Sequence, residues 1–147
     1  MTVAHDLSVP RTADSSEHRD AGPELRETAP DLRERVRQVY ARVDSGDIAG
    51  LLELFSEDVV YDRPGYPPIV GSPALERFYR GIRVIREGVH TPDAIVADGD
   101  GGVAVQGSFR GVLKDGRTVD LRYADFFRAA PDGRFRRRDT YFFAPMV

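Results

Sequence analysis

Residues 118–133 read TVDLRYADFFRAAPDG, and they combine the pattern of a β-strand with that of a turn. Successive side chains of a strand point to opposite faces, so the residues at every second position share one face. Those that share a face with Asp125 are apolar or aromatic: Val119, Leu121, Tyr123 and Phe127. The Pro-Asp-Gly sequence at 131–133 is typical of a tight turn. The segment therefore predicts one strand of an antiparallel sheet, with a carboxylate on its apolar face.

The rest of the chain extends this pattern in both directions. From His90 onward a two-residue period and turn sequences at 98–101, 114–116 and 131–133 predict four strands joined by tight turns. Upstream, a 3.6-residue period predicts helices over about 32–45, 48–55 and 72–85, with a short strand at 59–62. This order predicts an α+β domain in which a curved antiparallel sheet wraps around three helices.

Composition limits the class of protein. The 147 residues are enough for one domain, which we expect over 28–147, whereas the polar, aperiodic residues 1–27 predict a disordered N-terminal tail. The chain has no 18-residue apolar run and no visible secretory signal, so we expect a cytoplasmic protein without membrane contacts.

Charge and motifs exclude several kinds of chemistry. The chain has no cysteine, and its net charge of −3 argues against nucleic-acid binding. We expect the basic run of Arg134, Arg136, Arg137 and Arg138 to lie on a solvated strand face. Phosphate-binding, dinucleotide and zinc-protease motifs are absent, so we expect no metal and no cofactor.

Two aspartates are candidates for a buried site. A carboxylate at Asp125 on the apolar face needs an arginine partner, a proton or a cavity, and the sequence leaves these alternatives open. Asp62 ends the short strand on the same face as Val60, where it could equally be a turn residue. Arg63 is the next residue, so we expect it to face solvent or a dimer partner.

Two parts of the chain resemble a known family. VDSGDIAGLLELFSEDVVYDRPGYPPIVGSPALERFYRG (43–81) resembles the first half of a ketosteroid isomerase, and DLRYADFFRAAPDGRF (120–135) with YFFAP (141–145) resembles the end of that fold. The wider group is the nuclear transport factor 2-like superfamily, which includes SnoaL-like polyketide cyclases. The resemblance covers about residues 33–147 and implies a cone-shaped α+β barrel around a deep apolar cavity.

The resemblance also implies roles for individual residues. Asp62 matches the general base of the isomerases, and Asp125 matches their protonated carboxylic acid. An ungapped comparison puts Val39 at the position of the family's helix tyrosine, with Tyr40 one position away. Side chains expected to bind substrate are Tyr40, Tyr61, Tyr79, His90, Tyr123 and Tyr141.

The function implied is that of a cofactor-independent polyketide cyclase or isomerase in antibiotic-type biosynthesis. Asp62 and Asp125 would close an ether or carbocyclic ring on a hydrophobic, polyketide-like substrate by general acid-base catalysis, in a homodimer. Three alternatives stay open: a pericyclic cyclase that mainly folds a polyene, an epoxide hydrolase, and a non-catalytic ligand-binding or dimerisation module.

Overall fold

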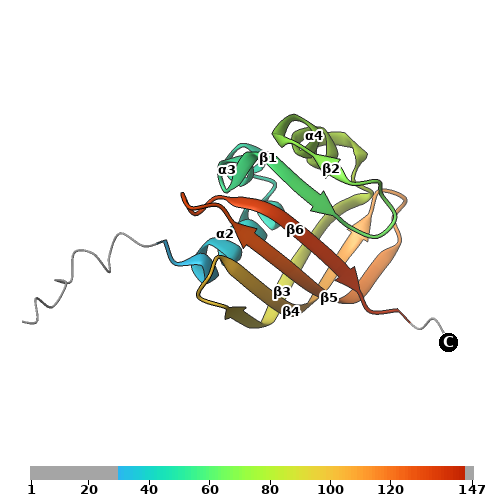
Figure 1. Cartoon of the computed structure of the whole chain (residues 1–147). Coiled ribbons are helices and arrows are strands. Elements are labelled where there is room, and N and C mark those ends of the chain that lie inside the picture. The colour runs from blue at the N-terminus through green and yellow to red at the C-terminus, as the bar shows by residue number, and fades with distance from the viewer. Residues whose placement is uncertain (1–29, 145–147) are drawn as a thin grey trace, which may run out of the picture.

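The computed structural model describes residues 30–144, which form a curved six-stranded sheet with helices along its concave side (Figure 1). The helical segments are α2 (Leu32–Ser45), α3 (Ile48–Glu53), α4 (Ser72–Arg77) and the π-helical turn η1 (Phe78–Ile82). The strands are β1 (Phe55–Asp62), β2 (Ile69–Val70), β3 (Ile85–Ala97), β4 (Gly102–Leu113), β5 (Thr118–Ala129) and β6 (Phe135–Phe142). The predicted α+β order is confirmed, and the predicted tail at 1–27 lies outside the described residues.

Helix α2 begins and ends where local chemistry requires it. The Asp31 side chain accepts hydrogen bonds from the backbone N–H groups of Arg33 and Glu34, which satisfies free donors of the first turn. Gly46 ends the helix in the left-handed conformation, with φ of 75°. The apolar stripe of the helix is buried against the sheet: Val36, Val39, Tyr40 and Val43.

The strand order is β2-β1-β6-β5-β4-β3. Strands β3 to β6 form the predicted antiparallel meander, but β6 also pairs with β1, and this pairing is parallel. The sheet is therefore mixed rather than purely antiparallel, and it is an open curved sheet rather than a closed barrel. Pairing of β1 with β6 brings the end of β1 beside residues 137–139.

Two element boundaries differ from those expected. The second helix ends at Glu53 rather than near Phe55, and β1 then starts at Phe55 and contains Ser56. The third helix ends in η1 at Ile82, so Ile85 belongs to β3. In both places the apolar residues at the helix end continue into the core as strand residues, which periodicity alone could not separate.

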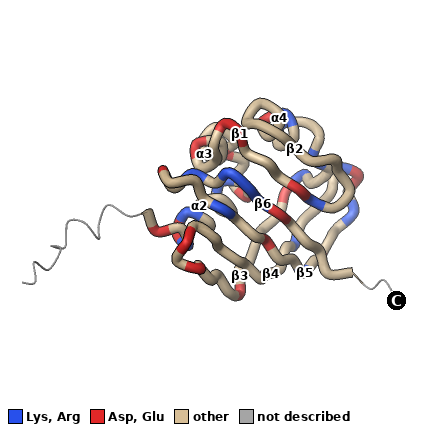
Figure 2. The backbone as a smooth tube through the Cα atoms, in the orientation of Figure 1, with Lys and Arg blue, Asp and Glu red and all other residues tan. Residues whose placement is uncertain are grey.

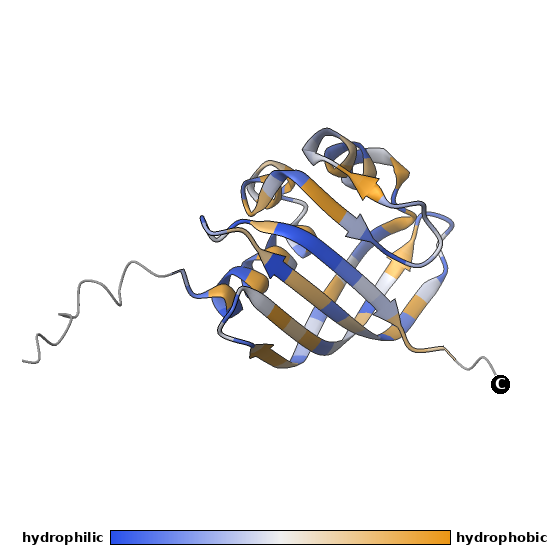
Figure 3. Cartoon of the chain, in the orientation of Figure 1, coloured by the Kyte–Doolittle hydropathy of each residue, from blue (hydrophilic) through white to orange (hydrophobic). Residues whose placement is uncertain are grey.

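The core lies between the concave face of the sheet and the helices. Alternation of apolar and polar residues along the long strands is visible in Figure 3, and the inward residues include Val103, Val105 and Phe109 on β4. On the outer face Phe126 and Tyr141 pack edge to face with 5.8 Å between ring centroids. The expected homodimer through this face stays a prediction.

A glycine on β4 permits a close approach between the backbones of β3 and β4. Gly107 pairs with Pro92 at an irregularity of β3, and a Cβ at Gly107 would lie 2.6 Å from the Thr91 carbonyl oxygen and 2.9 Å from the Tyr123 hydroxyl. We expect Gly107→Ala to lower the free energy of unfolding by about 1–3 kcal/mol, because the backbone must move to admit the methyl group.

Urea unfolding measures this effect, with Gly81→Ala as the matched control. A Cβ at Gly81 would meet nothing within 4 Å, and Gly81 does not have a positive φ, so that substitution should be neutral or stabilising. Equal stability of the two variants would contradict the packing constraint at Gly107.

Candidate active site

Asp125 lies at the centre of a buried polar network and has no solvent exposure. Its Oδ2 atom accepts hydrogen bonds from the Tyr40 hydroxyl at 2.7 Å and from an Arg138 nitrogen at 2.8 Å. Its Oδ1 atom accepts from the Thr140 hydroxyl. Strand alternation placed Asp125 correctly, and of the alternatives left open the structure shows both the arginine partner and a position in the lining of a small cavity. Since three donors point at this carboxylate, it serves as an acceptor, not as the hydrogen-bond donor that the family resemblance implied.

Arg138 supplies the counter-charge, although it was expected in solvent. It is 3% exposed, forms the ion pair with Asp125 and donates to the Tyr79 hydroxyl at 3.1 Å. Its guanidinium lies 4.8 Å from the centroid of the Tyr61 ring. Burial disfavours the cation, but Asp125 together with the surrounding tyrosines outweighs burial and raises the pKa of Arg138 well above its usual value.

The tyrosines around this ion pair remain protonated at neutral pH. Burial raises the pKa of Tyr61 to about 12 and that of Tyr123 to about 12. Burial raises the pKa of Tyr40 further, and Asp125 adds to that effect. Their hydroxyls can therefore donate hydrogen bonds, and the Tyr123 hydroxyl is buried without a partner among residues 30–144.

His90 forms a dyad with Asp44. The Nδ1 atom of His90 lies 2.6 Å from Asp44 Oδ1, and the backbone N–H of His90 donates to Asp44 Oδ2 at 2.8 Å. A carboxylate at Nδ1 selects the tautomer with the proton on Nδ1, so Nε2 is left as an acceptor. The ring is also held by stacking on Tyr40, with 4.9 Å between centroids. This arrangement is that of an oriented general base.

A small cavity joins these groups. It has a volume of about 20 Å³, enough for about one water molecule, and is lined by the buried Tyr123, Asp125 and Arg138 and by His90. Arg63 and Arg83 also line it, and because they are half-buried we take them to mark its mouth. Other lining side chains are Val43, Tyr61, Tyr79, Ile85, Phe109, Thr140 and Phe142. The interior is thus much smaller and more charged than the deep apolar cavity that was expected, because arginine and tyrosine side chains fill it.

The prediction that Asp62 and Asp125 face each other across the cavity is wrong. Asp62 points to the outer face of the sheet, is 39% exposed in its side chain and pairs with Arg137 at 2.6 Å. Arg137 also holds Asp139, so acidic and basic residues lie side by side along β6 and the end of β1 (Figure 2). The inward residues of β1 are Val59 and Tyr61, so alternation brings Arg63 into the cavity, whereas solvent was expected.

The expected substrate-binding residues divide into two groups. The cavity is lined by Tyr61, Tyr79, His90 and Tyr123, and Tyr40 contacts it indirectly through the hydrogen bond that its hydroxyl donates to Asp125. Tyr141 is 57% exposed on the outer face, because the inward positions of β6 are occupied by Arg138 and Thr140. Its expected role in the site is therefore wrong.

Comparison with known proteins identifies the family. The SnoaL-like domain family matches residues 36–138. The chain belongs to the SnoaL-like domain family. No curated protein matches the sequence.

Solved structures agree on the fold of this SnoaL-like domain. An NTF2-like protein of unknown function from Burkholderia pseudomallei K96243 is 22% identical, with a TM-score of 0.70 over 78% of this chain and 92% of that one. SalBIII, an epoxide hydrolase/cyclase-like enzyme in pyran ring formation in the polyether salinomycin, is 20% identical, with a TM-score of 0.66 over 76% and 90%. TerC, co-crystallised with polyporic acid, is 22% identical, with a TM-score of 0.67 over 76% and 91%.

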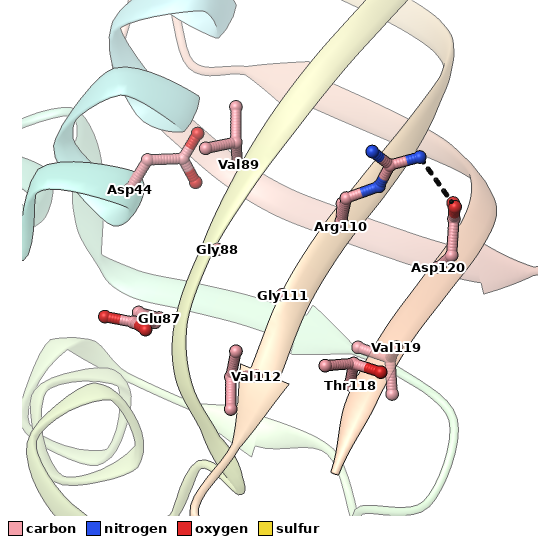
Figure 4. Close-up of a pocket in the computed structure, with 10 residues that line it drawn as sticks. All are labelled: Asp44, Glu87, Gly88, Val89, Arg110, Gly111, Val112, Thr118, Val119 and Asp120. Atoms are coloured by element: carbon pink, nitrogen blue, oxygen red, sulfur yellow. Dashed lines mark hydrogen bonds and ion pairs between the residues drawn. The ribbon is translucent and has the colours of Figure 1, made fainter. Parts of the chain in front are cut away.

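A larger depression of this SnoaL-like domain lies elsewhere. It is an open groove of about 770 Å³ over β3, β4 and β5, and Figure 4 shows Arg110 and Asp120 on it, paired at 3.0 Å. Asp44 lies at its other side, beyond Gly88. Because Arg110 and Asp120 are exposed and already paired, the groove offers weaker chemistry than the buried cavity. Over residues 30–144 there is neither a helix that could cross a membrane nor a cluster of side chains suited to a metal ion.

Five polar members of the site were not predicted to lie there: Asp44, Arg63, Arg83, Arg138 and Thr140. A signal existed for Arg138, since it shares its strand phase with Thr140 and Phe142. A β-bulge displaces that phase relative to Phe135, so a simple count from the start of β6 gives the wrong face. Asp44 and Arg83 could not be predicted from the sequence. Asp44 lies at the end of α2 and Arg83 just after η1, where periodicity no longer indicates which side chains face the core.

The dyad gives the SnoaL-like domain a defined pH dependence. Burial lowers the pKa of His90, and the hydrogen bond that His90 donates to Asp44 offsets this only in part; the charge of Arg138 lowers the pKa and that of Asp125 raises it. The unfolded chain, with a histidine pKa of about 6.5, therefore binds a proton that the folded chain rejects. We expect the free energy of unfolding to fall as pH decreases below about 6.5, by at most about 1.4 kcal/mol per pH unit from this group.

Urea unfolding between about pH 5 and 8 tests this, with His90→Gln as the comparison. The variant should lose that part of the pH dependence. A wild-type stability that instead decreases as pH rises through this range would show that Asp44 outweighs burial.

Proposed function

We propose that the protein is a cofactor-independent cyclase or isomerase of a polyketide-type carbonyl compound, with His90 as its general base. The supporting observation is the His90–Asp44 dyad, because His90 lines the same cavity as Tyr123, whose hydroxyl has no hydrogen-bond partner among residues 30–144. SalBIII adds weight, since it combines this fold with a role in pyran ring formation. In this proposal Asp125 positions Tyr40 and Arg138 and does not itself transfer a proton.

The step that fits these groups is an internal addition. His90 Nε2 takes the proton of a substrate hydroxyl, and the oxygen attacks the terminal carbon of a conjugated carbonyl. The new C–O bond forms as the C=C π bond breaks, and the electron pair moves to the carbonyl oxygen. Tyr123 donates a hydrogen bond to that enolate oxygen. The proton then passes from His90 to the enolate carbon, so the product is an isomer of the substrate.

A second candidate is hydrolysis of an epoxide. The cavity volume of about 20 Å³ is the size of one water molecule, and His90 and Asp125 both line it. A water that gives its proton to His90 would attack an epoxide carbon as the C–O bond of the ring breaks. Tyr123 would protonate the leaving oxygen, and the proton on His90 would then return to Tyr123. This reaction adds the elements of water, whereas ring closure leaves the mass of the substrate unchanged.

The test begins with the natural substrate. The gene is deleted, the compound that accumulates is purified, and it is incubated with the protein in water labelled with ¹⁸O. A cyclic isomer without label supports ring closure, and a diol with one labelled oxygen supports the hydrolase. If no compound accumulates and no metabolite is lost, the biosynthetic role is wrong and a ligand-binding module is favoured.

A further inference from the structure

Two arginines at the cavity mouth lack partners. Arg63, at the end of β1, holds its guanidinium between aromatic rings, 5.2 Å from the centroid of Tyr66 and 5.2 Å from that of Phe78. Arg83, which follows η1, lies over Tyr79 at 5.5 Å. The Nε atoms of both are buried without a hydrogen-bond partner, and within the described 30–144 range neither guanidinium forms an ion pair.

The charges of the cavity do not balance. Asp125 is already paired with Arg138, so Arg63 and Arg83 leave an excess of positive charge on a partly buried surface. Burial lowers the pKa of Arg83, and the neighbouring charge of Arg63 adds to that effect. Keeping two like charges together away from water costs stability, and such arrangements are typical of sites that receive the opposite charge.

We propose that Arg63 and Arg83 bind an anionic oxygen group of the substrate, a planar anion with two oxygens such as a carboxylate or the enolate of a 1,3-dicarbonyl. The flat guanidinium fork matches two coplanar oxygens. The half-buried rings of Tyr66 and Phe142 beside Arg63 suit an apolar carbon skeleton better than a hydrated tetrahedral ion.

This site names the substrate class of the proposed function and so rests on it. An anion held at the mouth by Arg63 and Arg83 would aim the adjoining carbons inward, toward His90 and Tyr123, which line the same cavity. Anchoring at the mouth also explains how a cavity of about 20 Å³ could serve a larger molecule, since only the reacting end needs to enter.

Calorimetric titration with benzoate tests the proposal, with benzamide as the neutral isostere, dimedone as the 1,3-dicarbonyl enolate and inorganic phosphate as the tetrahedral anion. Wild-type protein should bind benzoate and dimedone at least about 10-fold more tightly than benzamide or phosphate. Arg63→Met and Arg83→Met should each weaken benzoate binding by about 10- to 100-fold. Arg86→Met removes one exposed charge nearby and should leave it unchanged.

Two results would overturn the proposal: benzamide or phosphate binding as tightly as benzoate, or full benzoate affinity in both methionine variants. If a variant does not fold, the wild type still decides, because benzoate should shift the arginine Nε–H resonances of Arg63 and Arg83 in ¹H–¹⁵N spectra. Unshifted resonances at saturating benzoate would equally contradict it. No turnover is measured, so failure here leaves the proton-transfer role of His90 standing, and failure of that role leaves the anion site standing.

Discussion

Asp125→Asn is expected to lower the free energy of unfolding by about 3–5 kcal/mol, because it leaves the Arg138 charge buried without its partner. The substitution keeps the volume of the side chain and one oxygen that Tyr40 can still donate to, while the Thr140 hydroxyl can turn to accept from the new amide group. Loss of packing and loss of those hydrogen bonds are therefore small terms. What remains is the cost of an uncompensated guanidinium among Tyr61, Tyr40 and Phe127.

Two further variants separate charge from other effects in urea unfolding. Asp62→Asn breaks an exposed ion pair with Arg137 and should change stability by no more than about 1 kcal/mol. Asp125→Asn combined with Arg138→Met removes both buried charges and should recover at least half of the loss. If Asp125→Asn proves as mild as Asp62→Asn, the buried ion pair does not carry the stability assigned to it.

The fold followed from long, regular patterns. Strand β5 has 12 residues, and four of five successive inward positions are apolar, so its phase and the inward position of the fifth, Asp125, could be predicted. The three turns of the meander contain Asp-Gly sequences whose glycines have positive φ at Gly99, Gly101, Gly116 and Gly133. Parallel pairing of β1 with β6 could not be predicted, because it joins segments about 75 residues apart and leaves no local mark.

The site residues could be predicted from the sequence less well than the fold, because they lie at strand ends and bulges, where the alternating pattern is short. At the end of β1, Val59 and Val60 are both apolar, so alternation gave no decision between Asp62 and Arg63 as the inward residue. In the structure Arg63 is the inward residue, so a guanidinium lies in the cavity where the carboxylate of Asp62 was expected as the base. On β6 a bulge separates the basic run into solvated Arg136 and Arg137 and buried Arg138.

His90→Gln is expected to lower kcat by about 10²- to 10⁴-fold on the natural substrate, because the proposed general base is lost. Glutamine retains a donor toward Asp44, so the fold around the dyad should persist. Asp62→Asn is the matched control: the outer face of the sheet separates this carboxylate from the cavity, and its kcat should equal that of the wild type.

The pH profile distinguishes a base from a residue that merely supports the cavity. Burial lowers the pKa of His90, so kcat/KM should fall on the acid side with an apparent pKa below the usual histidine value of about 6.5. Asp44 raises the pKa of His90, and as a positioning residue it should affect the rate only through His90. Asp44→Asn should therefore lower kcat and move the acid limb of the profile to still lower pH. An acid limb that stays in place in Asp44→Asn, or a loss of rate in Asp62→Asn as large as in His90→Gln, would return the proton transfer to the aspartates.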